Sequence, residues 1–218
     1  MKTRTTKAVA ATALTALSLM LAGGAEAALV ERLGGKAIYD DVADLTWLQD
    51  ANYAKTSGYD ADGKMTWVQA NVWAGSLNID GVTDWRLPGG PMIAGSNQTA
   101  SEMGNLFYNV LGGSSNTHIA AMHNANFNLF KNVVILDARG FRMIQQAWSG
   151  VEIDSSNAWY FSFSSGNQRS NGKGSPLFAW AVRSGDVGAS PVPVPGALVL
   201  MGPALLGLLG VKRSRRRA

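Results

Sequence analysis

The stretch TWVQANVWAGSL, residues 66–77, gives the clearest local prediction in this chain. Thr66 is a residue type that caps helix N-termini, and the apolar residues at 67, 70, 74 and 77 recur at helical spacing. A second helix is predicted from Ser101 to Leu111, where Gly112-Gly113 ends it. Both predicted helices end by residue 111.

The pattern changes in the second half to short runs with strand character, at 133–136, 141–144, 158–163 and 177–182. Residues 137–140 predict a turn between the first two runs, and the Ser-, Asn- and Gly-rich residues 164–175 predict a long polar loop between the last two. Helices followed by antiparallel strands predict one α+β domain with two helices and an antiparallel sheet.

Both ends of the chain have the character of sorting signals. Three basic residues, an apolar run from Ala8 to Ala22 and Ala25-Glu26-Ala27 predict a signal peptide over residues 1–27, with an uncleaved anchor as the alternative. At the other end, a Pro-rich linker (187–195), an apolar segment (196–211) and a basic tail (212–218) predict a transmembrane helix with a cytoplasmic end. The exported body, residues 28–186, would then be held at the inner membrane.

The C-terminal arrangement resembles the PEP-CTERM sorting signal, which exosortases of Gram-negative bacteria read. Val194 stands where that motif has its glutamate. The resemblance implies an exosortase-like processing enzyme as a partner, and release or transfer of the domain to the cell surface; a simple C-terminal anchor is the alternative. The residues that carry it are Val192, Pro193, Pro195, Arg213, Arg215, Arg216 and Arg217.

Charge and cysteine content exclude several functions. The 218-residue chain has a net charge of +4, but residues 28–190 contain 11 basic and 14 acidic residues, a net charge of −3. The positive charge therefore belongs to the ends, and nucleic acid is not an expected partner. The chain has no cysteine, which excludes thiolate catalysis and cysteine metal sites.

Several short motifs follow one another in a familiar order: DLTWL (44–48), MTWVQA (65–70), DWRLP (84–88), SEM (101–103), AWS (147–149) and FAWAVR (178–183). They resemble the Lcl C-terminal-type domain, a family named for a collagen-like bacterial adhesin. In this chain residues 89–100 separate DWRLP from SEM. The resemblance implies a compact C-type-lectin-like fold, related also to formylglycine-generating enzymes, with carbohydrate or glycosaminoglycan binding. It does not imply catalysis, since the enzymatic relatives rely on cysteines.

The predicted loop at 164–175 is the leading candidate for ligand contact. Amides and hydroxyls suit polyhydroxylated ligands, and two cations would attract sulfate or uronate groups; an ordinary solvated loop is the alternative. Trp148 is a candidate stacking platform, although tryptophan is equally at home in a core. The candidate ligand-binding residues are Trp148, Asn167, Arg169, Asn171 and Lys173.

Other conspicuous residues have structural interpretations. In DWRLP the arginine fork is expected to close a buried corner, with Asp84 able to pair with it, rather than to bind a sugar. The remaining tryptophans at 67, 73, 159 and 180 are predicted to be core. No metal site or cofactor is predicted: Asp60-Ala61-Asp62-Gly63 fails the EF-hand pattern and indicates a turn, and His118 and His123 are five residues apart. Calcium held in another arrangement stays an alternative.

The sequence thus predicts a non-enzymatic, exported cell-surface or biofilm-matrix protein whose lectin-like domain binds polysaccharide. A structural matrix or envelope protein without a defined glycan ligand is the alternative. An enzyme acting on envelope glycans ranks third, because the chain offers no persuasive pair of carboxylates.

Overall fold

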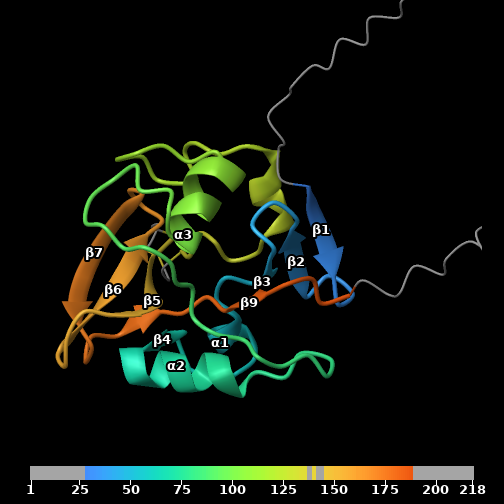
Figure 1. Cartoon of the computed structure of the whole chain (residues 1–218), viewed down its shortest axis with the longest axis horizontal. Coiled ribbons are helices and arrows are strands. Elements are labelled where there is room, and N and C mark those ends of the chain that lie inside the picture. Colours follow the sequence, from blue (N-terminus) through green and yellow to red (C-terminus); the bar gives the residue numbers. More distant parts are fainter. Residues whose placement is uncertain (1–27, 137–138, 141–144, 189–218) are drawn as a thin grey trace, which may run out of the picture.

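Two β-sheets organise the described residues of the computed structural model, which are 28–136, 139–140 and 145–188 (Figure 1). The first sheet has the order β1-β2-β3-β9, formed by Leu29–Arg32, Ala37–Asp40, Leu45–Leu48 and Val182–Ser184. All neighbours in it are antiparallel. Because β9 pairs with β3, the last strand closes the domain against its beginning.

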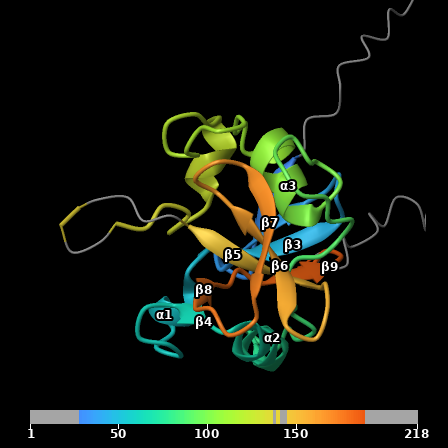
Figure 2. The ribbon, with the colours of Figure 1, turned by 90° about the vertical axis from the view of Figure 1, so that its left-hand side faces the viewer.

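The second sheet has the order β4-β8-β5-β6-β7. Its strands are Lys64–Met65, Leu177–Phe178, Gln146–Glu152, Asn157–Ser162 and Asn167–Gly172. The pairs are antiparallel except for β5 and β8, which run parallel at Ala147 and Phe178. Figure 2 shows β5, β6 and β7 side by side, with α2 and α3 at opposite ends of the view.

The helix predicted at residue 66 is confirmed as α2, Trp67–Ser76. The Thr66 hydroxyl accepts a hydrogen bond from the Gln69 N–H, and the Gln69 side chain accepts from the Thr66 N–H. This reciprocal capping satisfies two N–H groups that have no partner inside the helix. A short helix that the sequence did not indicate, α1 (Tyr53–Thr56), comes before it.

The second predicted helix is also present, beginning with α3, Glu102–Asn105, whose cap Ser101 accepts from the Gly104 N–H. The chain continues as one π-helical turn, Leu106–Val110. A 3₁₀ turn, Ala125–Leu129, follows later. Together the helices and the two sheets confirm an α+β domain.

Three predictions in the second half are wrong. Residues 133–136 form no strand; Val133 is buried as part of a loop that hydrogen-bonds Gln49 and Ala51 through Lys131. The run 177–182 divides between β8 and β9, which belong to different sheets. Half of the predicted loop 164–175 is strand β7, which is paired along its length with β6. The run 141–144 lies outside the described residues.

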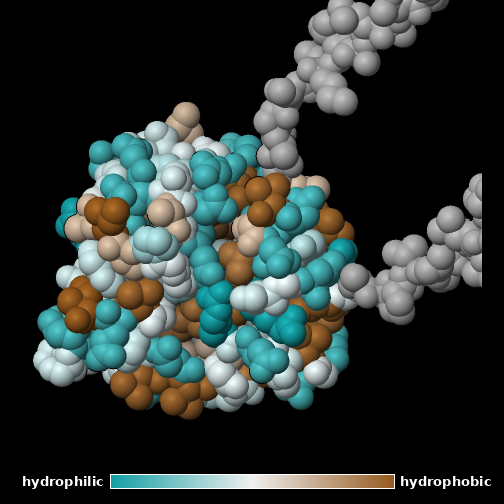
Figure 3. All heavy atoms as spheres, viewed as in Figure 1, coloured by the Kyte–Doolittle hydropathy of each residue, from teal (hydrophilic) through white to brown (hydrophobic). Residues whose placement is uncertain are grey.

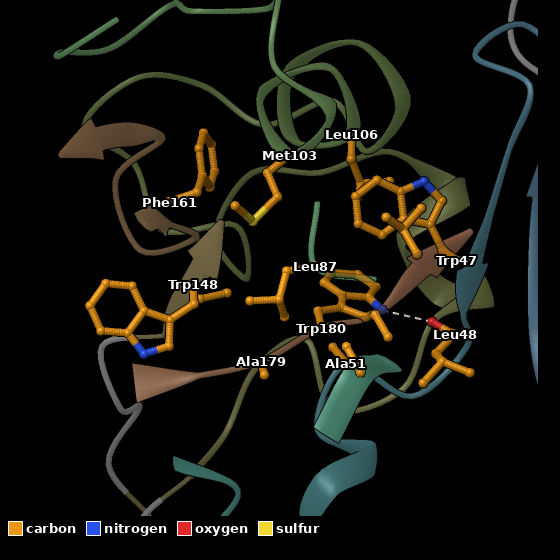
Figure 4. Close-up of a cluster of buried hydrophobic side chains, with 14 of the residues drawn as sticks. Trp47, Leu48, Ala51, Leu87, Met103, Leu106, Trp148, Phe161, Ala179 and Trp180 are labelled. Atoms are coloured by element: carbon orange, nitrogen blue, oxygen red, sulfur yellow. Dashed lines mark hydrogen bonds between the residues drawn. The ribbon is translucent and has the colours of Figure 1, made fainter. Parts of the chain in front are cut away.

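The core between the sheets is built from large aromatic and aliphatic side chains (Figure 4). Trp47 and Trp180 meet edge to face with ring centroids 5.4 Å apart, and the indole N–H of Trp180 donates to the Leu48 carbonyl at 2.7 Å. Burying an indole whose N–H has a partner gains apolar contact without leaving an unpaired donor. The core therefore fixes β3, which carries Trp47 and Leu48, against the segment from β8 to β9.

Candidate functional site

Strand β7 places two of the predicted ligand residues at one hollow. Asn167 and Arg169 alternate along the strand, so their side chains lie on one face of the sheet, across from Ser162 and Tyr160 of β6. They line a hollow of about 360 Å³ at this face. We call it the Arg169 hollow; its lining is Asn116, Gln146, Tyr160, Ser162, Ser164, Ser165, Asn167 and Arg169.

Hydrogen bonds between side chains hold the lining of the Arg169 hollow in place. The Gln146 amide donates to the Tyr160 hydroxyl at 3.3 Å, and the hydroxyl oxygens of Ser162 and Ser164 lie 2.8 Å apart. Ser96, from the loop before α3, donates to Asn167 Oδ1 at 2.8 Å. Hydroxyls and amides both donate and accept, so this lining can exchange hydrogen bonds with a polyhydroxylated molecule.

Arg169 supplies the positive charge of this hollow. Its side chain is exposed and makes no hydrogen bond or ion pair with the residues that the structure describes. The other arginines in those ranges are engaged: for example, Arg32 binds Asp186, and Arg183 donates to the Thr83 carbonyl. An arginine fork without a carboxylate partner can take an anionic group of a ligand in a bidentate manner.

Trp148 is not a stacking platform. It is fully buried, and its indole N–H donates to the Met65 carbonyl at 2.9 Å. Figure 4 shows it at one end of the buried cluster. The prediction was wrong because Trp148 lies within β5, between β8 and β6, with its indole against Met65 of β4, and not at the mouth of a loop.

Lys173 and Asn171 lie outside the hollow as well. The Lys173 ammonium sits 4.7 Å above the centre of the Trp67 ring and contacts the Glu152 carboxylate, so its charge is used within the protein. The side-chain oxygen of Asn171, Oδ1, accepts from the Gly172 N–H at 2.9 Å. The site that the sequence placed over five residues therefore keeps two of them.

The sequence missed the other contributors to the Arg169 hollow. Asn116 comes from a loop, Gln146 from β5, and Tyr160 and Ser162 from β6. None belongs to a recognisable motif, and only the sheet brings them together. Period-2 alternation on β6 was the one signal that could have placed Tyr160 and Ser162 on the same face.

DWRLP forms a structural corner, as predicted, but Arg86 has a different partner. Its guanidinium donates to both oxygens of Glu102 at 2.7 Å, which raises the pKa of Arg86 above its ordinary value. Glu102 also accepts from the Gly89 N–H at 2.7 Å. Asp84, which has a positive φ of 64°, makes no ion pair with Arg86.

The predicted turn at residue 60 is confirmed. One carboxylate oxygen of Asp60, Oδ1, accepts from the N–H groups of both Asp62 and Gly63, as in an aspartate-stabilised turn. His123 is exposed and stacks on Phe127 with ring centroids 4.1 Å apart. Across residues 28–136, 139–140 and 145–188, no three acidic or histidine side chains gather as a metal site would require.

The sorting-signal residues Val192, Pro193, Pro195, Arg213, Arg215, Arg216 and Arg217 lie outside the described residues, as does the predicted signal peptide. Among the residues that are described, no helix has the length and apolarity to cross a bilayer.

Comparison with known proteins agrees with the order of motifs in the body. The family model of the Lcl C-terminal domain matches residues 36–183, well over half of the chain. No curated protein and no solved structure matches this chain. The chain, from the β2 strand to the β9 strand, belongs to the Lcl C-terminal domain family.

Proposed function

We propose that this chain is an exported, non-enzymatic surface or matrix protein that binds polysaccharide in the Arg169 hollow. The observation that carries the proposal is an exposed arginine, unpaired within the described residues, in a recess otherwise lined by hydroxyls and amides. Side-chain hydroxyls and amides match sugar hydroxyls, and the guanidinium suits a carboxylate or sulfate on the polymer. The carbohydrate binding that the resemblance to the Lcl C-terminal-type domain implies supports this use.

Retention on immobilised polygalacturonate and chondroitin sulfate tests the proposal. We expect purified full-length protein to be retained at low salt and Arg169→Ala to lose about tenfold in affinity. The matched control is Lys131→Ala, which removes the same charge from an exposed residue outside the hollow and should behave as wild type. Equal retention of both variants would show that the hollow is not the site.

Export and tail processing are part of the same proposal. The predicted signal peptide and the PEP-CTERM-like tail support transport across the inner membrane, temporary anchoring there, and cleavage by an exosortase-like enzyme. Intact mass and location of the protein in its native host test this. A mature chain that keeps residues 191–218 in the inner membrane would leave a simple anchored domain.

A structural matrix role without a glycan ligand is the second candidate, and it is favoured if no polysaccharide is retained. We propose that the protein does not cleave glycans, because the residues that line the Arg169 hollow include no carboxylate. Release of reducing ends from polygalacturonate by the purified protein would overturn that part.

A further inference from the structure

Trp159 differs from the other tryptophans of the chain. Five of the seven are at most 2% exposed, and Trp67 packs against the core with its indole N–H bonded to the Ser149 carbonyl. Trp159 is only half-buried and is not among the residues packed against the core, and its side chain makes no hydrogen bond or ring contact with the described residues. The prediction that it is a core residue was therefore wrong.

The segment 88–95 crosses the face of the sheet on which Trp159 lies. At one end the Gly150 N–H of β5 donates to the Pro88 carbonyl, and at the other Gly95 exchanges two backbone hydrogen bonds with Gln168 of β7. Since β6 lies between β5 and β7, the segment must pass over β6. The Gln168 side chain bonds the Ile93 carbonyl, and Gln168 shares its face with Phe161 and hence with Trp159.

A second hollow of about 380 Å³ opens where this segment begins. We call it the Gly89 hollow. Its lining residues are three glycines, two apolar residues and three polar or charged ones: Gly89, Gly90, Gly150, Leu87, Val151, Asn71, Arg86 and Glu102. Gly150 and Val151 belong to an irregular stretch of β5, between Trp148 and Glu152, where the pairing with β6 shifts register. On β6, Trp159 lies opposite this stretch.

The Gly89 hollow combines polar with apolar lining residues, and its two charges compensate each other. Arg86 and Glu102 neutralise each other, yet their side chains are 40% and 20% exposed. The Asn71 amide donates to the Trp67 carbonyl, which leaves its oxygen as an acceptor. Gly89 leaves open space at the hollow, whereas a side chain on Gly90 or Gly150 would meet protein atoms at 3.1 and 3.4 Å. Trp159 lies across the ladder from the irregular stretch of β5 that contains Gly150, and an indole offers a surface on which the C–H face of a sugar can stack.

Trp159 and Tyr160 are consecutive on β6, so they point to opposite faces of the sheet. Tyr160 lines the Arg169 hollow, and Trp159 lies on the face crossed by segment 88–95. We propose that the Gly89 hollow with Trp159 is a second binding site, for uncharged sugar rings, so that one molecule joins two polysaccharide chains, one on each face. The bridging rests on the proposed function of the Arg169 hollow.

The surface around the domain is compatible with contacts at separate sites. Figure 3 shows polar side chains over most of the visible face, with apolar groups in small separate clusters. A broad apolar patch on that face would instead have favoured a protein partner.

A two-polymer capture assay tests the second site. Full-length protein held on polygalacturonate beads is offered fluorescent dextran, hydroxyethyl cellulose and galactomannan, each uncharged, and each is also immobilised directly. We expect at least one of the three to be captured, and the capture to persist at a salt concentration that weakens retention on polygalacturonate, because stacking on an indole does not depend on charge.

Two substitutions address the Gly89 hollow without touching the other site. A side chain at Gly89 meets nothing within 4 Å and needs no left-handed backbone, so Gly89→Val projects into open space beside the hollow. We expect Gly89→Val and Trp159→Ala to lose about tenfold in capture of the neutral polymer, while retention on polygalacturonate stays within twofold. Trp159→Phe should keep most of the capture, and Gly174→Val, which is equally free of contacts, should behave as wild type.

The outcomes separate this inference from the proposed function. Retention on polygalacturonate with no capture of any neutral polymer overturns the second site alone. Capture by Gly89→Val and Trp159→Ala at the wild-type level also overturns it, as does loss of neutral binding in Arg169→Ala. Failure of the wild type on every acidic polymer overturns the proposed function, while direct binding to the immobilised neutral polymers still tests the Gly89 hollow.

Discussion

At the scale of single residues, one ion pair, Arg86 with Glu102, holds a corner of the fold together. Arg86 and Glu102 join the end of DWRLP to the start of α3, and Glu102 satisfies the Gly89 N–H in addition. Because the pair is partly exposed, its contribution to stability comes from the two-point hydrogen bonding and from the Gly89 N–H that Glu102 satisfies, more than from charge alone. The 12 residues that separate DWRLP from SEM leave this corner intact.

Glu102→Ala should lower the free energy of unfolding by about 2 kcal/mol, because it strands a half-buried guanidinium and an amide. Asp84→Asn should be nearly neutral, since asparagine tolerates the left-handed backbone that Asp84 adopts. Urea denaturation of both variants measures the difference. A larger loss in Asp84→Asn would mean that Asp84 is the partner of Arg86 after all.

At Gly63 the side chain of Asn52 lies so close to the backbone that no other residue type fits. It has a φ of 81°, and a side-chain carbon placed on it would lie 1.8 Å from Asn52 Oδ1, whereas Gly58, at a φ of 76°, has free space. Gly58→Ala should cost about 1 kcal/mol for backbone strain, and Gly63→Ala considerably more, because Asn52 is buried and cannot withdraw. Equal thermal shifts would contradict the clash.

At the scale of elements, local sequence determines where α2 begins, and tertiary packing determines which of its residues are buried. Its cap is encoded within four residues, but its apolar residues are spread widely: Ala70, Trp73 and Ala74 are buried while Val68 and Val72 are exposed. The helix therefore begins where local chemistry dictates, and the face that is buried depends on what packs against it.

Thr66→Ala should destabilise the protein by about 1 kcal/mol, because it removes the hydroxyl that accepts from the Gln69 N–H. Thr66→Ser keeps that acceptor and should retain most of the stability. Thermal unfolding followed by circular dichroism compares the two. A serine variant as unstable as the alanine variant would show that the threonine methyl group matters more than the cap.

At the scale of the whole molecule, the two ends of the domain are joined by Arg32 and Asp186, with nitrogen–oxygen distances of 2.7 and 2.8 Å. The hydrogen bonds from Arg32 hold the pKa of Asp186 below its ordinary value, against an opposing effect of burial. A carboxylate of this kind stabilises the fold above its unfolded pKa, and the stabilisation is lost as pH falls through the folded pKa.

Asp186→Asn should therefore be less stable than wild type at pH 7, and the difference should shrink as the pH falls below about 4. Urea denaturation at pH 7, 5 and 3 measures this. The matched control is Lys36→Ala, which breaks a more exposed pair with Asp80 and should cost little at any of these values. A difference that stays constant with pH would show that the Asp186 charge is not involved.

The sequence by itself determined the local and ordered features of this protein: the cap of α2, the start of α3, the turn at Asp60, the α+β class and the family of the domain. These depend on contacts between residues close in the chain, or on motifs that keep their order. Only the tertiary structure decided that Trp148 is buried, that Trp159 is not, and that residues 167–172 are a strand. Strand pairing uses backbone groups that every residue carries, so a strand polar on both faces leaves no periodic signal, and the burial of a side chain depends on which distant segment covers it.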